Sequence, residues 1–263
     1  MEGFIMNLKK VLTGAVVFTM AATMLASCGQ PKETADTGTG AKKFVIATDT
    51  AFPPFEFTNA SQEFVGIDVD ILDAIAEDQG FEYELNSLGF DAALAAVQAG
   101  QADGVIAGMS ITEERKNIFD FSEPYYDADV TIAVAPGSEI KSFEDLKGQK
   151  VAVKTGTNGS DYAKSIADEL GLTITEFKDS PTMYQDVITG NTVACFEDYP
   201  VMAFNVQQGA QLEIPDDCLA AGSSYGFAVQ KGKNAELLEM FDAGLKNIKE
   251  NGKFQEIIDS YTK

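Results

Sequence analysis

The feature that most constrains the fold is a regular alternation of short apolar runs with helical patterns, which starts near Lys42. In the first half of the chain, a buried strand is predicted at residues 44–47, further strands at residues 82–85 and 103–106, and helices at residues 69–79 and 91–99. A parallel strand pair needs a long crossover connection, and a helix usually supplies it. This alternation therefore favours parallel sheets in an α/β fold.

The same pattern restarts after Pro136 and Gly137. Strands are predicted at residues 150–153, 173–177 and 192–196, helices at residues 161–170, 181–189 and 200–208, and two closing helices at residues 235–251 and 254–261. Longer extended segments, residues 129–135 and 219–230, divide the two halves. The sequence thus predicts two α/β lobes.

Two crossing strands, near residues 125–131 and 219–225, are expected to join these lobes. Because the chain leaves the first lobe, completes the second and then returns, lobe 1 should comprise residues 42–128 plus 223–263. Lobe 2 should comprise residues 129–222.

The N-terminus has the pattern of a secretory signal. Lys9 and Lys10 precede an apolar run at residues 11–22, which is too short for a comfortable membrane span. Residues 1–27 are therefore interpreted as a signal peptide. The sequence leaves open whether Met1 or Met6 starts the chain.

The apolar run ends in Leu25-Ala26-Ser27-Cys28-Gly29, which resembles a bacterial lipobox. That resemblance implies a lipoprotein signal, with cleavage before Cys28 and diacylation of its sulfur as a membrane anchor. Residues 28–41 are polar or flexible and are interpreted as a tether.

Composition excludes several classes of function. The chain has 19 basic and 41 acidic residues, a net charge of −22, which opposes binding to nucleic acid. It has no histidine, so Ser–His–Asp and Cys–His catalysis are excluded.

Cys195 and Cys218 have no companion ligands, so no metal is expected, and no cofactor motif is found. A disulfide between these two cysteines and two free thiols remain alternatives.

Polar blocks at strand ends carry the most specific signal. The chain reads Gly108-Met-Ser110-Ile-Thr112-Glu-Glu-Arg115, followed by Asp-Phe-Ser-Glu-Pro-Tyr-Tyr at residues 120–126; further blocks are residues 47–57, 65–70, 154–160 and 197–200. The succession strongly resembles the polar amino-acid-binding proteins of ABC importers, bacterial solute-binding family 3. Within that family it is most similar to glutamine-binding proteins.

This resemblance implies a periplasmic-binding-protein-like fold of type II and an exported receptor rather than an enzyme. Such a receptor binds a polar amino acid between its lobes and delivers it to the permease subunits of an ABC importer. A lipid-anchored monomer on the outer face of the cell membrane is expected, or on the periplasmic side in a Gram-negative cell.

The residues at these positions suit an α-amino acid, which carries a carboxylate and an ammonium on one carbon. Arg115 can bind the carboxylate through two parallel hydrogen bonds, and it is expected one turn into a helix capped by Thr112. Gly108 and Ser110 lie at the adjoining strand end, where open α/β sheets bind ligands.

The second half supplies the matching groups. The loop around Thr157 should offer backbone N–H donors at a helix start, and Asp198 should accept the ammonium. Phe52 and Phe90 of the first half can pack on the aliphatic part of the ligand and lend a cation–π interaction. By resemblance to the glutamine-binding members, Asp49 and Lys154 contact the side-chain amide.

Structural alternatives compete with these roles. Arg115 could pair with surface carboxylates such as Glu113, Glu114 or Asp120, and Asp198 could merely cap a helix. Phe52 and Phe90 could be core residues, and Lys154 an ordinary strand-end lysine.

The choice of ligand and the class of function also stay open. Asn158 and Glu197 depart from the glutamine-binding pattern, and the added charge of Glu197 leaves arginine or lysine as alternative ligands. An amino-acid dehydratase on the same fold is the rival class, because fold alone does not decide function.

Overall fold

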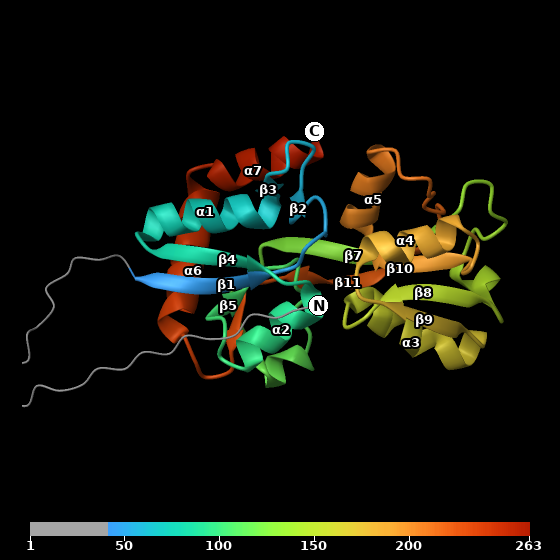
Figure 1. Ribbon diagram of the computed structural model, residues 1–263, viewed down its shortest axis with the longest axis horizontal. Helices are drawn as coiled ribbons and strands as arrows, with labels where there is room; N and C mark the ends of the chain where they lie inside the picture. Colours follow the sequence, from blue (N-terminus) through green and yellow to red (C-terminus); the bar gives the residue numbers. More distant parts are fainter. Residues whose placement is uncertain (1–41) are drawn as a thin grey trace, which may run out of the picture. The chain divides into compact units, whose positions relative to one another are not determined.

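Two five-stranded sheets organise residues 42–263, the part of the chain that the computed structural model describes (Figure 1). The first sheet has the order β4 (Glu82–Ser87), β1 (Lys43–Thr48), β5 (Gly104–Val105), β12 (Ala228–Gln230) and β6 (Phe119–Phe121). The second has the order β11 (Leu219–Tyr225), β7 (Tyr126–Val134), β10 (Ala194–Asp198), β8 (Lys150–Lys154) and β9 (Thr173–Phe177). The signal peptide, Cys28 and the tether predicted within residues 1–41 lie outside the described residues.

Helices cover both faces of the first sheet because its strand β1 is apolar on both sides. Ile46 of β1 packs in one core cluster with α1 (Ile67–Gln79), α6 (Ala235–Glu250) and α7 (Lys253–Thr262). Its neighbour Ala47 packs in a second cluster with α2 (Phe90–Gln98). Successive side chains of a strand point to opposite faces, so these clusters lie on the two sides of the sheet. This sheet and its helices form lobe 1.

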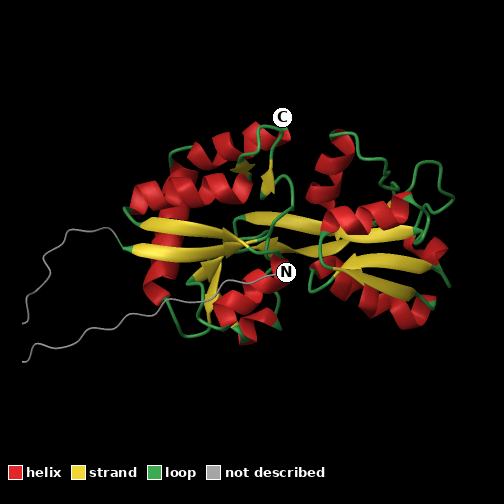
Figure 2. Ribbon diagram, in the orientation of Figure 1, coloured by secondary structure: helices red, strands yellow, loops and turns green. Residues whose placement is uncertain are grey.

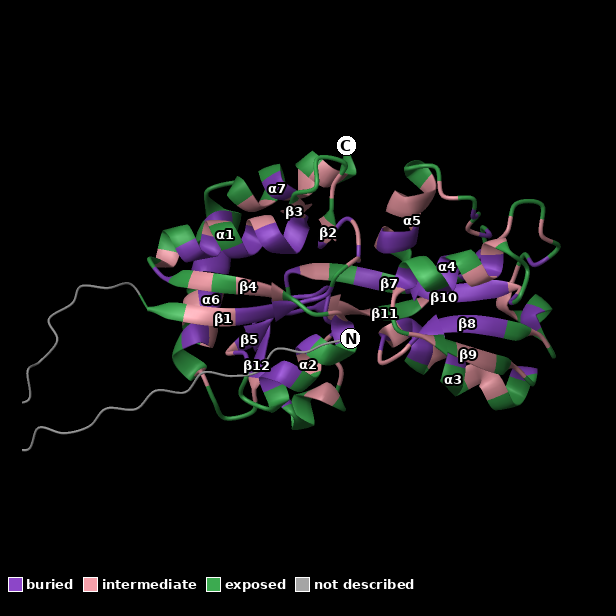
Figure 3. Cartoon of the chain, viewed as in Figure 1, coloured by how far each residue is buried: buried purple, intermediate pink, exposed green. Residues whose placement is uncertain are grey.

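The second sheet is built in the same way and forms lobe 2. Val153 of β8 packs in the cluster that contains α3 (Asn158–Leu170). Ala152 packs in the cluster that contains residues of α4 (Ser180–Ile188) and α5 (Tyr199–Gln207). Figure 2 shows helices on both sides of these strands, and Figure 3 shows that the three central strands β7, β10 and β8 are mostly buried.

Local signals in the sequence set the helix boundaries. Thr157 precedes α3, and its hydroxyl oxygen accepts a hydrogen bond from the Ser160 N–H at 3.2 Å. Gly171 ends the same helix with φ of 66°, a left-handed conformation that glycine adopts without steric cost. The predicted helix over residues 161–170 therefore begins three residues earlier but ends where expected.

The prediction of parallel sheets is correct only in part. β1 pairs in parallel with β4 and β5, and β8 with β9 and β10. In contrast, β12 is antiparallel to β5 and β6, and β7 is antiparallel to β10 and β11. Within the two five-stranded sheets, these antiparallel pairs all contain a strand of the segments that pass between the lobes. These segments run antiparallel to strands of the βα units, so each of the two sheets contains both parallel and antiparallel pairs.

Several elements differ from their predicted form. β10 lies two residues beyond the predicted strand over residues 192–196, and the hairpin of β2 (Phe57–Thr58) with β3 (Phe64–Val65) was not predicted. The extended segment predicted over residues 219–230 is divided into β11 and β12. Between them, the Phe227 N–H donates to the Ser122 hydroxyl at 2.9 Å instead of continuing the ladder.

β7 and β11 are the two crossing strands, and they pair with each other in the second sheet. They are tied to lobe 1 where they leave it, because Tyr225 forms a β-bridge with Ser110 and accepts a hydrogen bond from the Tyr125 N–H at 2.9 Å. The lobe boundaries at residues 128/129 and 222/223 stay a prediction.

Candidate functional site

The predicted site residues follow strands of both sheets. Asp49 comes directly after β1, and Ser110 lies in the loop after β5, whereas Lys154 and Asp198 are the last residues of β8 and β10. Open α/β sheets bind ligands outside the carboxyl ends of their strands. The carboxyl ends of strands from both lobes therefore contribute residues to the same candidate site.

One small cavity gathers eight of the nine predicted binding residues. These eight are Phe52, Phe90, Gly108, Ser110, Arg115, Lys154, Thr157 and Asp198, and they line the cavity together with Ala107 and Asn158. The ninth residue, Asp49, is not part of the lining. The cavity holds about 10 Å³, which is about the space that one water molecule needs.

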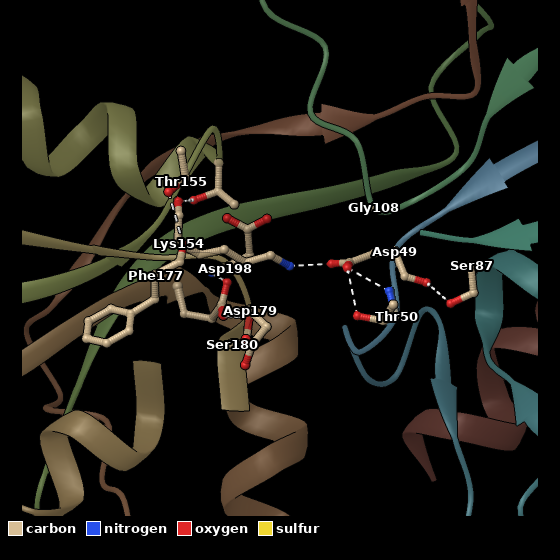
Figure 4. Close-up of polar contacts among 12 residues, drawn as sticks. Asp49, Thr50, Ser87, Gly108, Lys154, Thr155, Phe177, Asp179, Ser180 and Asp198 are labelled. Atoms are coloured by element: carbon tan, nitrogen blue, oxygen red, sulfur yellow. Dashed lines mark hydrogen bonds and ion pairs between the residues drawn. The ribbon is translucent and has the colours of Figure 1, made fainter. Parts of the chain in front are cut away.

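Asp49 reaches the site through a buried ion pair with Lys154, which joins the lobes (Figure 4). Each of the two side chains is only 2% exposed. The Lys154 ammonium also lies 4.8 Å from the ring centroid of Phe52 and 5.7 Å from that of Phe90. Burial alone would lower the pKa of Lys154, but the charges of Asp49 and Glu197 outweigh burial and raise it. Lys154 is therefore a buried cation and not an ordinary strand-end lysine.

Arg115 is held by carbonyl oxygens of both lobes. Its Nη1 donates to the Ser110 carbonyl at 2.7 Å, and its Nη2 donates to the Gly156 carbonyl at 2.6 Å. The guanidinium carbon also lies 5.4 Å from the centroid of the Phe90 ring. Burial lowers the pKa of Arg115, but a guanidinium stays protonated in proteins. The cation therefore faces the cavity.

The surface alternative for Arg115 is wrong within the described residues. Glu113 pairs with Lys116, and Asp120 pairs with Lys231, whereas Arg115 forms no ion pair there. The predicted helix at this position is also wrong. Arg115 begins a 3₁₀ turn of three residues, Arg115–Asn117, and only the Thr112 hydroxyl, which accepts from the Arg115 N–H at 3.2 Å, agrees with the expected cap.

Asp198 presents one free carboxylate oxygen. Its Oδ2 accepts a hydrogen bond from the Tyr225 hydroxyl at 2.5 Å, and its buried Oδ1 has no partner among the described residues. The alternative of a helix cap is wrong, because α5 starts after Asp198 without a hydrogen bond to its side chain. Burial first, and then the charge of Glu197, raise the pKa of Asp198 to about 7.

The Thr157 side chain has a structural role at the cavity wall. Its hydroxyl donates to the Lys154 carbonyl at 2.8 Å and accepts from the Ser160 N–H at 3.2 Å. The hydroxyl is therefore satisfied within its own loop. What remains at this wall is the start of α3, whose first backbone N–H groups point out of the helix.

Phe52 and Gly108 form one tight contact in lobe 1. Gly108 has a φ of 52°, and a Cβ built on it would lie 2.5 Å from the Phe52 ring. Only glycine fits there, because a side chain would clash with the Phe52 ring and because this positive φ disfavours other residues. Phe52 and Phe90 are 4% and 5% exposed, so these rings belong to the core and line the cavity as well.

Sequence reasoning missed two groups at this site. The Asn158 side chain lines the cavity, and its buried Nδ2 has no partner among the described residues. Its place directly after the cap Thr157 was the available signal. The contact of Tyr225 with Asp198 had no local signal, because it joins residues 27 positions apart.

Glu197 is near the site but faces away from the cavity. It accepts hydrogen bonds from the Ser180 and Tyr184 hydroxyl groups, both at 2.8 Å. Burial raises the pKa of Glu197, against the lowering effect of Lys154 and the two hydroxyl groups. It is not among the lining residues, but its charge raises the pKa of two of them, Lys154 and Asp198.

Other chemistry has little support in the described part of the chain. Cys195 and Cys218 are both buried and free, so the disulfide alternative is wrong. Across residues 42–263, no cluster of three or more Cys, Asp or Glu side chains could hold a metal ion. None of the helices in this range combines the length and apolar character that crossing a membrane requires.

Comparison with known proteins identifies the family. The profile of the bacterial extracellular solute-binding proteins, family 3, matches residues 44–263. A probable histidine-binding protein of Neisseria gonorrhoeae is 30% identical over 264 residues, which cover 97% of this chain and 96% of that protein.

Solved structures extend this likeness to the fold. Substrate-binding domain 2 of Lactococcus lactis GlnP, in an open conformation, is 45% identical with a TM-score of 0.59, covering 84% of this chain and 95% of that one. An ancestral arginine-binding protein bound to arginine is 37% identical with a TM-score of 0.78, and the match covers 84% of this chain and 98% of that one. An ancestral arginine-binding protein bound to glutamine is 36% identical with a TM-score of 0.77, and the match covers 84% of this chain and 97% of that one. The type II periplasmic-binding-protein-like fold is thus confirmed, and the chain belongs to the bacterial extracellular solute-binding proteins of family 3.

Proposed function

We propose that this extracellular protein is the receptor of an ABC importer, and that it binds one amino acid in the cavity between its lobes. The observation that carries the proposal is that a half-buried cation, Arg115, and a buried carboxylate, Asp198, line the same cavity. An α-amino acid needs one group of each sign close together. The relatives whose names specify histidine or arginine support an amino acid as the ligand class.

Both groups keep hydrogen-bonding capacity for a ligand. A guanidinium has five N–H donors, and Arg115 uses two of them on the Ser110 and Gly156 carbonyls. The remaining donors can bind the ligand carboxylate. Asp198 can accept from the ligand ammonium through Oδ1, which has no partner among the described residues.

Entry of the ligand requires the lobes to separate. The cavity of about 10 Å³ is too small for an amino acid, since it is near the size of one water molecule. Two contacts bridge the lobes across it, from Arg115 to Gly156 and from Lys154 to Asp49. Opening must break both contacts, and closure on a ligand would reform or replace them, as in other proteins that close about a hinge.

Glutamine is the favoured ligand, and arginine or lysine is second. Lys154 neutralises Asp49, and the Glu197 carboxylate is engaged by two hydroxyl groups. Among the described residues that line the cavity, Asp198 is then the one carboxylate, and none remains there for a second ligand cation. A neutral carboxamide can use both members of the Lys154–Asp49 pair, as donor and acceptor. The arginine named for several relatives keeps basic amino acids as the second candidate.

The test is a thermal-shift panel of the twenty amino acids on the mature protein, followed by calorimetry on those that raise the melting temperature. A ligand that binds only the folded state raises that temperature. We expect glutamine to give the largest shift. A panel without any shift would overturn the proposal. Recovery of chemically unchanged ligand separates the receptor from a dehydratase-type enzyme, which would convert its ligand.

Attachment to the membrane rests on Cys28. Two acyl chains on a mature lipoprotein suffice for stable attachment, whereas one chain is marginal. We expect Cys28→Ala to appear in the medium or to remain unprocessed, with binding of the ligand unchanged. A variant of mature size that still fractionates with membranes would contradict the anchor. The permease subunits as partner and the monomeric state are part of the same proposal.

A further inference from the structure

Two carboxyl groups are buried close together in lobe 1, where the Asp68 N–H donates to the carbonyl oxygen of Phe55, the residue before Glu56, at 2.9 Å. The recognition of an amino acid described above does not use them. Glu56 lies between β1 and β2, Asp68 is the second residue of α1, and both are 0% exposed. Both oxygens of Glu56 and Oδ1 of Asp68 have no partner from an N–H or hydroxyl donor among the described residues. Buried carboxylates are costly without such partners, so these three oxygens need an explanation.

The fourth oxygen of the pair is fully used. Asp68 Oδ2 accepts from the Gly108 N–H at 2.7 Å and from the Tyr125 hydroxyl at 2.9 Å. Gly108 lines the cavity, and Tyr125 directly precedes the crossing strand β7. Because the peptide group is planar, this contact also fixes the orientation of the whole peptide between Ala107 and Gly108. Asp68 thus joins the cavity wall to the start of a crossing strand.

A proton between the two carboxyl groups accounts for the oxygens without a partner. Two carboxylates that share a site cannot both ionise readily. Burial, followed by the charges of Asp68 and Asp49, raises the pKa of Glu56 well above its usual value, against the lowering effect of Lys154. Burial also raises the pKa of Asp68 to about 7, against the lowering effect of the hydrogen bonds from Gly108 and Tyr125. Because Asp68 Oδ2 already accepts two hydrogen bonds that stabilise its charge, Asp68 suits the role of acceptor and Glu56 that of protonated donor.

We propose that Glu56 and Asp68 share one proton and act as positioning residues, whose single negative charge orients Gly108 and Tyr125 at the cavity. Uptake of a second proton below neutral pH then weakens these two hydrogen bonds and with them the binding of the amino acid. The effect on binding rests on the function proposed above, whereas the shared proton does not.

Infrared spectroscopy tests the shared proton without any ligand. At pH 8, the wild-type protein should show the carbonyl stretch of a neutral carboxyl group, and Glu56→Gln should remove that band. Glu56→Gln keeps the shape of the side chain and a donor toward Asp68, so it should fold. If the band is absent from wild type, or is retained in Glu56→Gln, the shared proton is overturned whether or not the protein binds amino acids.

Calorimetry with L-glutamine and L-arginine as probes, at pH 8 and pH 6, tests the positioning role. At pH 8, Asp68→Asn should weaken binding about tenfold, because hydrogen bonds to a charged acceptor are the stronger ones. Between pH 8 and pH 6, wild type should lose more affinity than Asp68→Asn, which has one carboxyl group fewer to protonate. Asp198 titrates in the same range in both proteins, so the difference between them reports Asp68.

Asp70→Asn is the matched control. Asp70 lies on the same helix and also accepts from a tyrosine hydroxyl, that of Tyr261 at 2.9 Å, but among the described residues its side chain forms no hydrogen bond with the cavity lining. It should leave both affinities and their pH dependence unchanged. A purely structural role of Asp68 would weaken binding equally at both pH values, and that result would overturn the positioning role. If wild type binds neither probe, the proposed ligands and the effect on binding fail together, while the infrared result still decides the shared proton.

Discussion

At the scale of single residues, Arg115 combines two roles, since its guanidinium bridges carbonyl oxygens of both lobes and keeps free donors at the cavity. Every α-amino acid carries the carboxylate that these donors would bind. Loss of a buried charge-assisted contact typically costs a few kcal/mol, so Arg115→Ala should weaken binding by about a hundredfold or more. Calorimetry measures this change.

Lys116→Ala is the control for that substitution. Lys116 is next in the chain, but it is exposed and pairs with Glu113. Exposed ion pairs contribute little, so this variant should bind as wild type does. Undiminished affinity of Arg115→Ala would end the assignment of the site.

Lys154 should determine which class of ligand side chain is preferred. It should have less effect on the binding of the carboxylate and ammonium that all amino acids share. Its ammonium is buried against Asp49 and two aromatic rings. If glutamine is the ligand, Lys154→Met removes a donor to the carboxamide, and it should weaken glutamine binding more than the binding of a smaller neutral amino acid. It also leaves Asp49 unpaired, which should improve the binding of arginine. Competition calorimetry with these ligands measures the change in preference.

The outcome for arginine discriminates the two candidates. A basic ligand in wild type predicts that Lys154→Met binds it as well or better, and that Glu197→Gln binds it less well. Equal losses for all three ligands would show that Lys154 only maintains the fold of the site.

At the scale of elements, the pairing of β7 with β11 depends on Gly222. A Cβ at this position would lie 1.8 Å from the Ala128 carbonyl oxygen, at a register shift between Ala220 and Ser223. Gly222→Ala must therefore separate the crossing strands locally. We expect it to lower the free energy of unfolding by about 1–3 kcal/mol, as measured by urea denaturation.

Ala221→Ser is the matched change at the neighbouring exposed position. Because its side chain faces solvent, we expect a change of less than about 0.5 kcal/mol. Equal stabilities of Gly222→Ala and wild type would show that the crossing strands tolerate the displacement, and that this close approach is not needed.

At the scale of the whole molecule, binding should be coupled to closure of the lobes. The open Lactococcus domain has the higher sequence identity with this chain but the lower TM-score, 0.59 against 0.78 for the arginine-bound ancestral protein. That order is expected if lobe separation, rather than the fold of each lobe, differs among these proteins. Saturating ligand should then reduce the radius of gyration of the mature protein in small-angle scattering.

Arg115→Ala at the same ligand concentration is the control for compaction, because it should bind too weakly to close. An unchanged radius of wild type, with binding confirmed by calorimetry on the same sample, would contradict hinge closure.

The sequence by itself determined the order of the elements and the residue types at the strand ends. Side-chain periodicity is local, so it predicted the strand at Thr173–Phe177 without error and the strand at Lys43–Thr48 to within one residue at each end. The combination of Arg115 with the block that precedes it indicated the family, because that pattern is also contained in one short stretch of chain.

Only the tertiary structure decided which of these groups meet and in what state of charge. Asp49 and Lys154 are 105 positions apart, and no local pattern reveals that they form a buried ion pair. Glu197 faces two hydroxyl groups instead of the cavity, and β12 runs antiparallel to its neighbours because the chain returns through the second crossing strand. Contacts across the fold depend on how the lobes pack, and packing also sets the burial that moves the pKa of Asp198 to about 7.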